Sequence, residues 1–253
     1  MQPEGMPVEK ARTTKGWFPD LSRRSDADER LQDPRADPDK VRHTLSEFRI
    51  VNRLFSRIRT LTLRHIMPDI ARRGLRSVTL LDVGSGGGDF ARWFAGYCAA
   101  KGIGARVFGL DIDPRAVDFA RGAAPSGNAV RIIEGDALSY DMEQLKPDYI
   151  VANHLLHHLS DAAIPDFLSK VYRSAGCGVL VADLARSRAA YLGFSLVAPL
   201  LFARSYTFAD GMVSIRRGFK RSEIAGYLER ARLESRFRIG SMLPARIYLL
   251  GMK

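Results

Sequence analysis

The sequence has few of the features that mark secreted or membrane-spanning proteins. Its two cysteines, Cys98 and Cys177, lie in separate apolar segments and favour buried thiols over a disulfide framework. No apolar run approaches the roughly 18 residues that a bilayer-crossing helix needs. Residues 1–16 also lack the apolar segment of a secretory signal. We therefore expect a cytoplasmic protein; peripheral contact with a membrane surface stays open, as does the choice between monomer and homodimer.

Positive charge is abundant but unevenly distributed. The formal net charge is +11 at pH 7, yet residues 78–183 carry 9 basic and 13 acidic side chains. The excess comes from residues 1–77, with 17 basic against 11 acidic, and from residues 184–253, with 13 against 4. Nucleic-acid binding needs a basic surface at the site itself. Because the middle of the chain is acidic, we expect a small molecule rather than nucleic acid as the partner.

Short apolar runs alternate with stretches of helical periodicity between residues 78 and 183. The pattern predicts strands at 78–83, 107–110, 130–134, 149–152 and 179–182, and helices at 90–100, 115–123, 155–159 and 162–174. Such alternation is typical of a mostly parallel sheet with both faces covered. A helix at 222–231 and two strand-like runs at 235–242 and 245–251, separated by Pro244, predict an antiparallel hairpin at the sheet edge.

The segments that flank this core differ in character. Residues 1–39 are rich in Asp, Arg, Pro and Ser without a sustained period, so we expect a disordered tail. Residues 40–73 have the apolar spacing of one or two amphipathic helices. Residues 185–218 contain an apolar run from Tyr191 to Ala203. An insertion of this length is usually functional when ordered, and we favour a lid over a membrane-surface contact or a core helix.

The most informative segment is a buried strand that ends in a glycine-rich turn, Val78-Thr-Leu-Leu-Asp-Val-Gly-Ser-Gly-Gly-Gly-Asp-Phe90. Asp89 is the expected N-cap of the following helix. A dinucleotide fingerprint would need glycine at position 89, and a phosphate loop would need Gly-Lys-Ser/Thr, which is absent. Asp82, two residues before the first glycine, would repel a pyrophosphate and attract an ammonium group. The turn therefore indicates a cationic ligand.

Acidic residues also follow the next two predicted strands. Asp111 ends the second strand, where doubly wound folds bind ribose hydroxyls, and Asp136 follows the third. The carboxyl ends of parallel strands meet at one edge of a sheet, which is the general ligand crevice of open α/β folds. Three acids in register there predict one binding site.

Together these motifs resemble the class I S-adenosylmethionine (SAM)-dependent methyltransferases. They are most similar to the small-molecule branch that includes ubiquinone/menaquinone-type and polyketide O-methyltransferases. The resemblance rests on Asp82-Val-Gly-Ser-Gly-Gly-Gly, Asp111-Ile-Asp, Gly135-Asp-Ala and the segment from Asp148 to Leu159. It implies a Rossmann-like α/β fold with a seven-stranded, mostly parallel sheet, an antiparallel edge hairpin, N-terminal helices and an inserted lid. Residues 40–253 would form a single methyltransferase domain with its cofactor-binding core at 78–183.

The resemblance also implies a cofactor, SAM, with S-adenosylhomocysteine (SAH) as product, and roles for individual residues. Asp111 would hold the ribose hydroxyls, Asp136 the adenine amino group, and Asp82 the glycine turn and the ammonium end. The backbone of Asn153 would lie near the methionine. The full set of implied cofactor-binding residues is Asp82, Gly84, Ser85, Gly86, Gly88, Asp111, Ile112, Asp136, Ala137 and Asn153.

Three histidines follow the fourth predicted strand, His154, His157 and His158. Their i, i+3, i+4 spacing puts them on one face if the segment is helical. His154 foremost, and also His158, are candidate general bases because histidine titrates near neutral pH. A structural role, capping the helix and packing under the site, is the alternative. No metal is expected, since Asp161 is the only acid close by in sequence.

Aromatic and basic residues in and after the lid segment are candidates for binding the acceptor: Tyr191, Phe194, Arg216 and Phe219. A solvated basic turn is the alternative interpretation of the last two. With the apolar lid and the histidines, they indicate methylation of a hydrophobic aromatic or quinol-like hydroxyl. An RNA or other nucleic-acid methyltransferase is one alternative, although Asn153-His-Leu-Leu lacks the prolines typical of enzymes that methylate exocyclic amino groups. A non-catalytic SAM-binding protein is the other.

Overall fold

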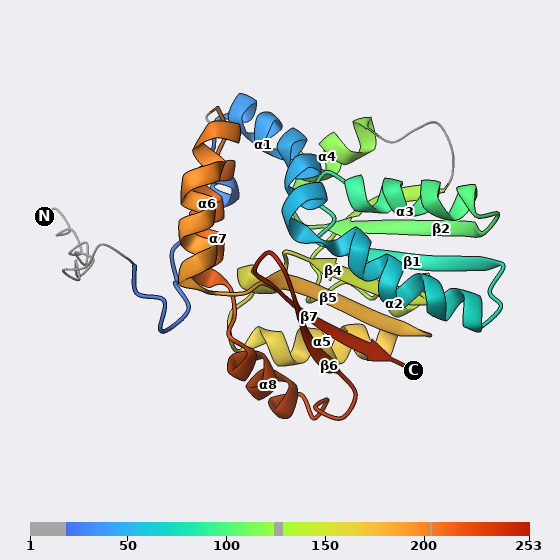
Figure 1. The fold of residues 1–253 in the computed structure, drawn as a ribbon. Helices are drawn as coiled ribbons and strands as arrows, with labels where there is room; N and C mark the ends of the chain where they lie inside the picture. Colours follow the sequence, from blue (N-terminus) through green and yellow to red (C-terminus); the bar gives the residue numbers. More distant parts are fainter. Residues whose placement is uncertain (1–18, 124–128, 203) are drawn as a thin grey trace, which may run out of the picture.

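A seven-stranded sheet forms the centre of the computed structural model, which describes residues 19–123, 129–202 and 204–253. The strand order is β3-β2-β1-β4-β5-β7-β6 (Figure 1). Strands β1 to β5 pair in parallel, whereas β7 runs antiparallel to β5 and β6, so the predicted fold class and edge hairpin are confirmed. The strands are β1 Ser77–Val83, β2 Gly104–Asp111, β3 Val130–Glu134, β4 Tyr149–Asn153, β5 Gly178–Leu184, β6 Arg238–Met242 and β7 Arg246–Met252.

Helices cover both faces of the sheet. Because side chains alternate along a strand, Leu80 packs with α2 and α3, and its neighbour Leu81 packs with α5 and α8. Both side chains are fully buried. These helices are α2 Ile58–Arg72, α3 Asp89–Ala100, α5 Ala163–Ser174 and α8 Arg221–Arg230. The two apolar layers hold the sheet rigidly, and this positions the strand ends that carry the site.

Sequence signals set several of the helix starts. Asp37 caps α1 (Pro38–Val51) and Asp113 caps α4 (Pro114–Gly122), and in both helices proline occupies the first position. Helix α3 differs from the expectation, because Gly88 with φ 70° takes the cap position and Asp89 is the first helical residue. Gly88 thereby ends the turn in a left-handed conformation that suits glycine.

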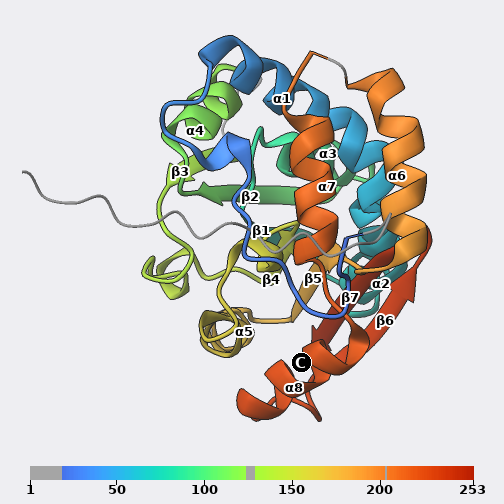
Figure 2. The same ribbon diagram turned by 90° about the vertical axis from the view of Figure 1, so that its left-hand side faces the viewer.

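Two further helices stand across the carboxyl ends of the parallel strands, α6 (Arg188–Leu201) and α7 (Thr207–Arg217) (Figures 1 and 2). They make up most of the segment predicted as a lid. Their connection is fastened to α1, where Thr44 Oγ1 accepts a hydrogen bond from the Tyr206 N–H at 3.0 Å. No helix in the described ranges is long and apolar enough to cross a membrane. Helix α6 nevertheless leaves five apolar side chains exposed, Leu192, Leu196, Val197, Leu200 and Leu201.

The prediction of a disordered tail is wrong for residues 19–37. These residues pack along the side of the molecule where the parallel strands end (Figure 2). We call this segment the N-terminal strap. Arg24 donates hydrogen bonds to the carbonyl oxygens of His157 and Leu159, both at 3.1 Å, and Glu29 is buried. Polar side chains and distant carbonyls make these contacts, and neither leaves a periodic apolar pattern in the sequence. Residues 1–18 of the predicted tail lie outside the described residues.

Candidate active site

A cavity of about 710 Å³ opens at the carboxyl edge of the sheet, below α1, α6 and α7. This volume falls in the range of small-molecule sites. One part is polar and contains nine of the ten predicted cofactor-binding residues, all except Gly88. The lining also contains apolar side chains, which include Phe48, Val51, Phe55, Phe194, Val197 and Ile215.

The glycine turn is fixed by hydrogen bonds to the end of β2. The N–H groups of Gly84 and Ser85 donate to the Leu110 carbonyl oxygen at 2.8 and 3.1 Å. The Gly86 N–H donates to Asp111 Oδ2 at 2.7 Å. Gly84 has φ 70°, and a Cβ there would come within 3.0 Å of Leu155. The turn therefore needs glycine, and Asp111 has a structural role besides the predicted one on ribose.

Gly88, the tenth predicted residue, does not line the cavity. A Cβ at Gly88 would lie 3.0 Å from Nη1 of Arg92 and 3.3 Å from the Ala120 side chain. Its small size lets α3 approach α4. Gly87 and Asp89 line the cavity in its place.

Three carboxylates, those of the buried Asp82 and Asp89 and of the half-buried Asp111, lie beside the glycine turn. Burial, followed by the charges of Asp89 and Asp111, raises the pKa of Asp82 well above its usual range. Burial also raises the pKa of Asp89 and of Asp111. Asp82 Oδ2 and Ser85 Oγ are buried without a hydrogen-bond partner. A positively charged N–H donor would satisfy both atoms and relieve the crowding of negative charge, so the residues fit the ammonium end of SAM and not a phosphate.

A chain of hydrogen bonds leads from this acidic cluster across the cavity. Asn52 Nδ2 donates to Asp89 Oδ1 at 2.9 Å, and Asn153 Nδ2 donates to Asn52 Oδ1 at 3.1 Å. Arg246 Nη2 donates to Asn153 Oδ1 at 3.3 Å. Asn52 begins a π-helical turn between α1 and α2, and Arg246 begins β7. The sequence analysis missed both residues because neither belongs to a motif and the fold alone brings them together.

The histidine segment is not the helix predicted at 155–159. It contains a single 3-10 turn, Leu156–His158, so the three rings do not share a helical face. His154 precedes this turn in a left-handed conformation with φ 58°, and its N–H donates to the Ala182 carbonyl oxygen at 3.0 Å. His154 Nε2 is buried without a partner. Burial and then the charge of Arg246 lower the pKa of His154 well below its usual range, so its ring is neutral.

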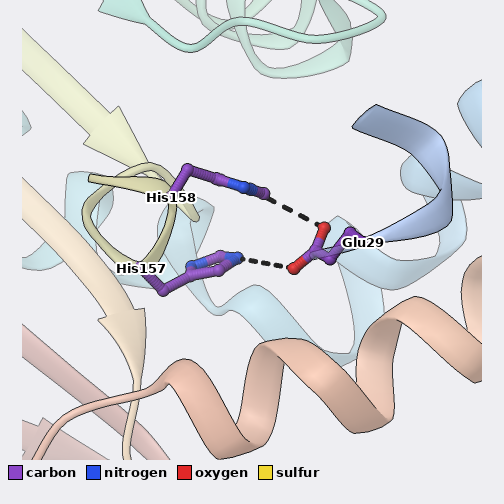
Figure 3. Close-up of side chains that lie close together, drawn as sticks. All are labelled: Glu29, His157 and His158. Atoms are coloured by element: carbon purple, nitrogen blue, oxygen red, sulfur yellow. Dashed lines mark ion pairs between the residues drawn. The ribbon is translucent and has the colours of Figure 1, made fainter. Parts of the chain in front are cut away.

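His157 is buried between two carboxylates. Its Nδ1 lies 2.7 Å from Asp183 Oδ1, and its Nε2 lies 3.5 Å from Glu29 Oε1 (Figure 3). Burial alone would lower the pKa of His157, but Asp183 and Glu29 raise it to about 9. Burial likewise opposes the ionisation of Glu29, yet its contact with His157 and the positive charge that His158 acquires in acid lower the pKa of Glu29 to about 2. His157 is therefore an imidazolium that joins the strap to β5.

His158 lines the cavity next to this ion pair. Its Nε2 lies 3.9 Å from Glu29 Oε2, and its Nδ1 lies 2.8 Å from Gln32 Nε2. Burial and the charge of His157 lower the pKa of His158 to about 4, so it is neutral. Two sets of three groups lie close enough to share a cation, Glu29 with His157 and His158, and His154 with His157 and Asp183. Both sets include His157, whose two ring nitrogens already face carboxylates. We therefore interpret both sets as parts of an ion-pair network.

Residues 80–178, which span the glycine turn, the three acids and the histidine segment, match the family model described as Methyltransferase domain. This segment of the chain is therefore similar to methyltransferase domains. A comparison with curated protein sequences returns no significant match.

Solved methyltransferase structures share the fold of this chain. The plantazolicin methyltransferase BamL, in complex with a triazolic desmethylPZN analog and SAH, superposes with a TM-score of 0.60 at 17% identity, covering 83% of this chain and 91% of BamL. Human N-acetylserotonin methyltransferase in complex with SAM superposes with a TM-score of 0.58 at 17% sequence identity, and the match covers 86% of this chain and 56% of the human protein. A SAM-dependent methyltransferase from Aquifex aeolicus superposes with a TM-score of 0.55 at 17% sequence identity, and the match covers 85% of this chain and 98% of that protein. At such identities the likeness establishes the fold alone.

The structure places the four predicted acceptor-binding residues in different surroundings. Phe194 lines the cavity, whereas Tyr191, Arg216 and Phe219 do not. Arg216 instead donates to Ser25 Oγ of the strap at 3.2 Å. Phe219 is 1% exposed and packs edge-on against Tyr227, because the backbone at this position pairs with the chain just after β5 and turns the ring into the core. The prediction is therefore wrong for these three residues.

Proposed function

We propose that this methyltransferase transfers the methyl group of SAM to a hydroxyl oxygen of a small, apolar, aromatic or quinol-like acceptor. One observation carries the proposal: a single cavity joins apolar side chains to a cluster of acids in which Asp82 Oδ2 and Asp89 Oδ2 are buried without a hydrogen-bond partner. The acids suit a cationic cofactor, and the aromatic side chains on α1 and α6 suit an apolar acceptor. The acidic lining opposes a polyanion such as RNA.

In the cofactor half of the cavity, the chain's residues bind and orient. Asp82 and Ser85 Oγ would hold the ammonium group, and Asp111 would accept hydrogen bonds from the ribose hydroxyls while it keeps the glycine turn in place. Asp136 and Ala137 would lie beside the adenine, on the side opposite Ile112. When bound, SAM supplies an electrophilic methyl group on a positively charged sulfur.

In the acceptor half, we assign His154 the role of general base. The oxygen lone pair forms the new bond to the methyl carbon, the carbon–sulfur pair stays on sulfur, and the hydroxyl proton passes to His154 Nε2. This atom is free to accept because no hydrogen bond occupies it. His158, also neutral and facing the cavity, is the second candidate. Most of the rate enhancement would come from holding the two reactants in line.

The test is an acceptor screen with SAM labelled in its methyl group. Matched pairs such as 2-naphthol and 2-naphthylamine share one skeleton and separate oxygen from nitrogen as the target, and bulk tRNA serves as a comparator. We expect label on the hydroxyl compounds, with one SAH formed per product. Label on amines, carbon positions or RNA instead, or bound SAM without any turnover, would contradict the proposal.

A further inference from the structure

Arg246 is a buried cation in the wall of the cavity. The residue is 1% exposed, and its one hydrogen bond runs from Nη2 to the neutral amide of Asn153 at 3.3 Å. Its Nε and Nη1 atoms are buried without a partner. Among the described residues that line the cavity, Arg246 is the only Arg or Lys.

No carboxylate among the residues that the structure describes forms an ion pair with this guanidinium. Asp183 attracts Arg246 through space, but no ion pair or hydrogen bond joins the two side chains. Asp183 Oδ1 already faces His157 Nδ1 and accepts from the Leu184 N–H, each at 2.7 Å, while Oδ2 accepts from the His157 N–H at 3.2 Å. Burial lowers the pKa of Arg246 only to about 10, so the side chain stays cationic at neutral pH. A buried charge without a counter-ion costs free energy, which a bound anion would recover.

The backbone of Arg246 lies away from the glycine turn in the sheet, and its side chain extends to Asn153 at the end of β4. The glycine turn, Asp111 and Asp136 follow β1, β2 and β3, whereas Arg246 begins β7, three strands beyond β1 in the order β1-β4-β5-β7. At about 4.8 Å between neighbouring strands, the separation at the sheet is about 14 Å. The nearby lining of the cavity, Leu184, Pro244 and Ala245, is apolar.

We propose that Arg246 binds an anionic oxygen of the acceptor, so that the substrate class is an apolar, aromatic-type molecule that carries a carboxylate besides the group to be methylated. The identity of the reaction rests on the proposed function above, but the anion site does not. The guanidinium donates from Nε and Nη1 to the carboxylate, while Asn153 keeps Nη2 in place.

This arrangement also couples acceptor binding to His154. The charged and titratable groups that face His154 are Arg246, Asp183, His157 and His158. Arg246 makes the largest contribution of these four, and it opposes protonation of the ring. An acceptor carboxylate on Arg246 would offset that charge, and His154 would become a better base only when the acceptor is present.

The experiment uses the SAH-loaded protein and two probes of equal shape, 2-naphthoate and 2-naphthamide, titrated by calorimetry. Wild type should bind naphthoate at least tenfold more tightly than naphthamide. Arg246→Met should remove this preference, and Arg246→Lys should keep part of it. Arg238→Met, on the exposed face of β6 in the same hairpin, should leave the preference unchanged.

Equal binding of the two probes to wild type would overturn the inference, and so would an unchanged preference for naphthoate in Arg246→Met. If that variant kept the preference and also lost SAM affinity tenfold, Arg246 would be assigned to the cofactor's carboxylate. If Arg246→Met does not fold, thermal stabilisation of wild type by naphthoate and not by naphthamide decides the question. Because no arm measures methyl transfer, failure of the proposed function and failure of the anion site are distinguishable.

Discussion

The carboxylate of Glu29 lies 3.5 Å from His157 Nε2, on the far side of the ring from Asp183. Ser214 Oγ on α7 donates to the same Glu29 oxygen at 2.6 Å. One buried side chain therefore joins the N-terminal strap, β5 and the helix pair over the cavity. The strap therefore closes part of the site through a buried ion pair as well as through the apolar contacts of Leu31 and Ala36.

Replacement of Glu29 by Gln should release the strap. The variant loses the ion pair and leaves the His157 imidazolium with Asp183 alone, so the strap opens more often. We expect trypsin to cleave after Arg23, Arg24, Arg30 or Arg35 about tenfold faster than in wild type, since cleavage follows local opening. Asp26→Asn, an exposed change in the same segment, is the control. Equal cleavage of the two variants would show that Glu29 does not hold the strap.

The raised pKa of His157 predicts a loss of stability at alkaline pH. Its pKa rises from 6.5 to about 9 on folding, so the ion pair contributes fully below pH 6.5 and is lost as the pH rises through 9. The free energy of unfolding should fall by about 3 kcal/mol across this window. Urea unfolding at pH 6.5, 7.5 and 9 measures the slope. His157→Gln should flatten it and His43→Gln, on the exposed side of α1, should not; a wild-type curve without slope would contradict the assigned charge.

The raised pKa of Asp82 predicts that SAM affinity depends on pH. Below that pKa the carboxyl is protonated and cannot pair with an ammonium group, so affinity should rise with pH. Calorimetry in buffers of different ionisation enthalpy should show that protons are released on binding. Asp82→Asn should bind more weakly and lose the pH dependence. Retention of the full pH dependence in the variant would assign the proton to Asp89 or Asp111.

The role of His154 can be separated from cofactor binding. His154→Ala removes the free Nε2, and we expect kcat to fall by about 10²-fold or more with the acceptor found in the screen. SAM affinity should be unchanged. His158→Ala, which removes a neutral ring from the same cavity, is the matched comparison and should have the smaller effect. Full activity of His154→Ala would leave that residue a structural role.

The cofactor half of the site was predictable because its signals are local. Asp82, the glycines and Asp111 lie within one strand–turn–helix–strand unit, where the chain direction fixes their meeting point. The acceptor half depends on contacts between distant segments. Arg246 reaches Asn153 only because β7 pairs with β5, and Asn52 arrives through an irregular π-helical turn. Phe219 was misassigned for the same reason. Its backbone pairs with Ala185, and the sequence alone does not show toward which side this pairing directs the Phe219 ring.

The central claim is that the glycine turn and its acids bind a cationic amino-acid nucleoside, and a calorimetric titration of SAM tests it most directly. We predict saturable one-to-one binding to wild type, no binding of NAD, and a loss of affinity of about tenfold or more in Asp111→Asn. Asp118→Asn, exposed on α4, should bind like wild type. Absence of SAM binding, or binding of NAD with equal affinity, would contradict the account.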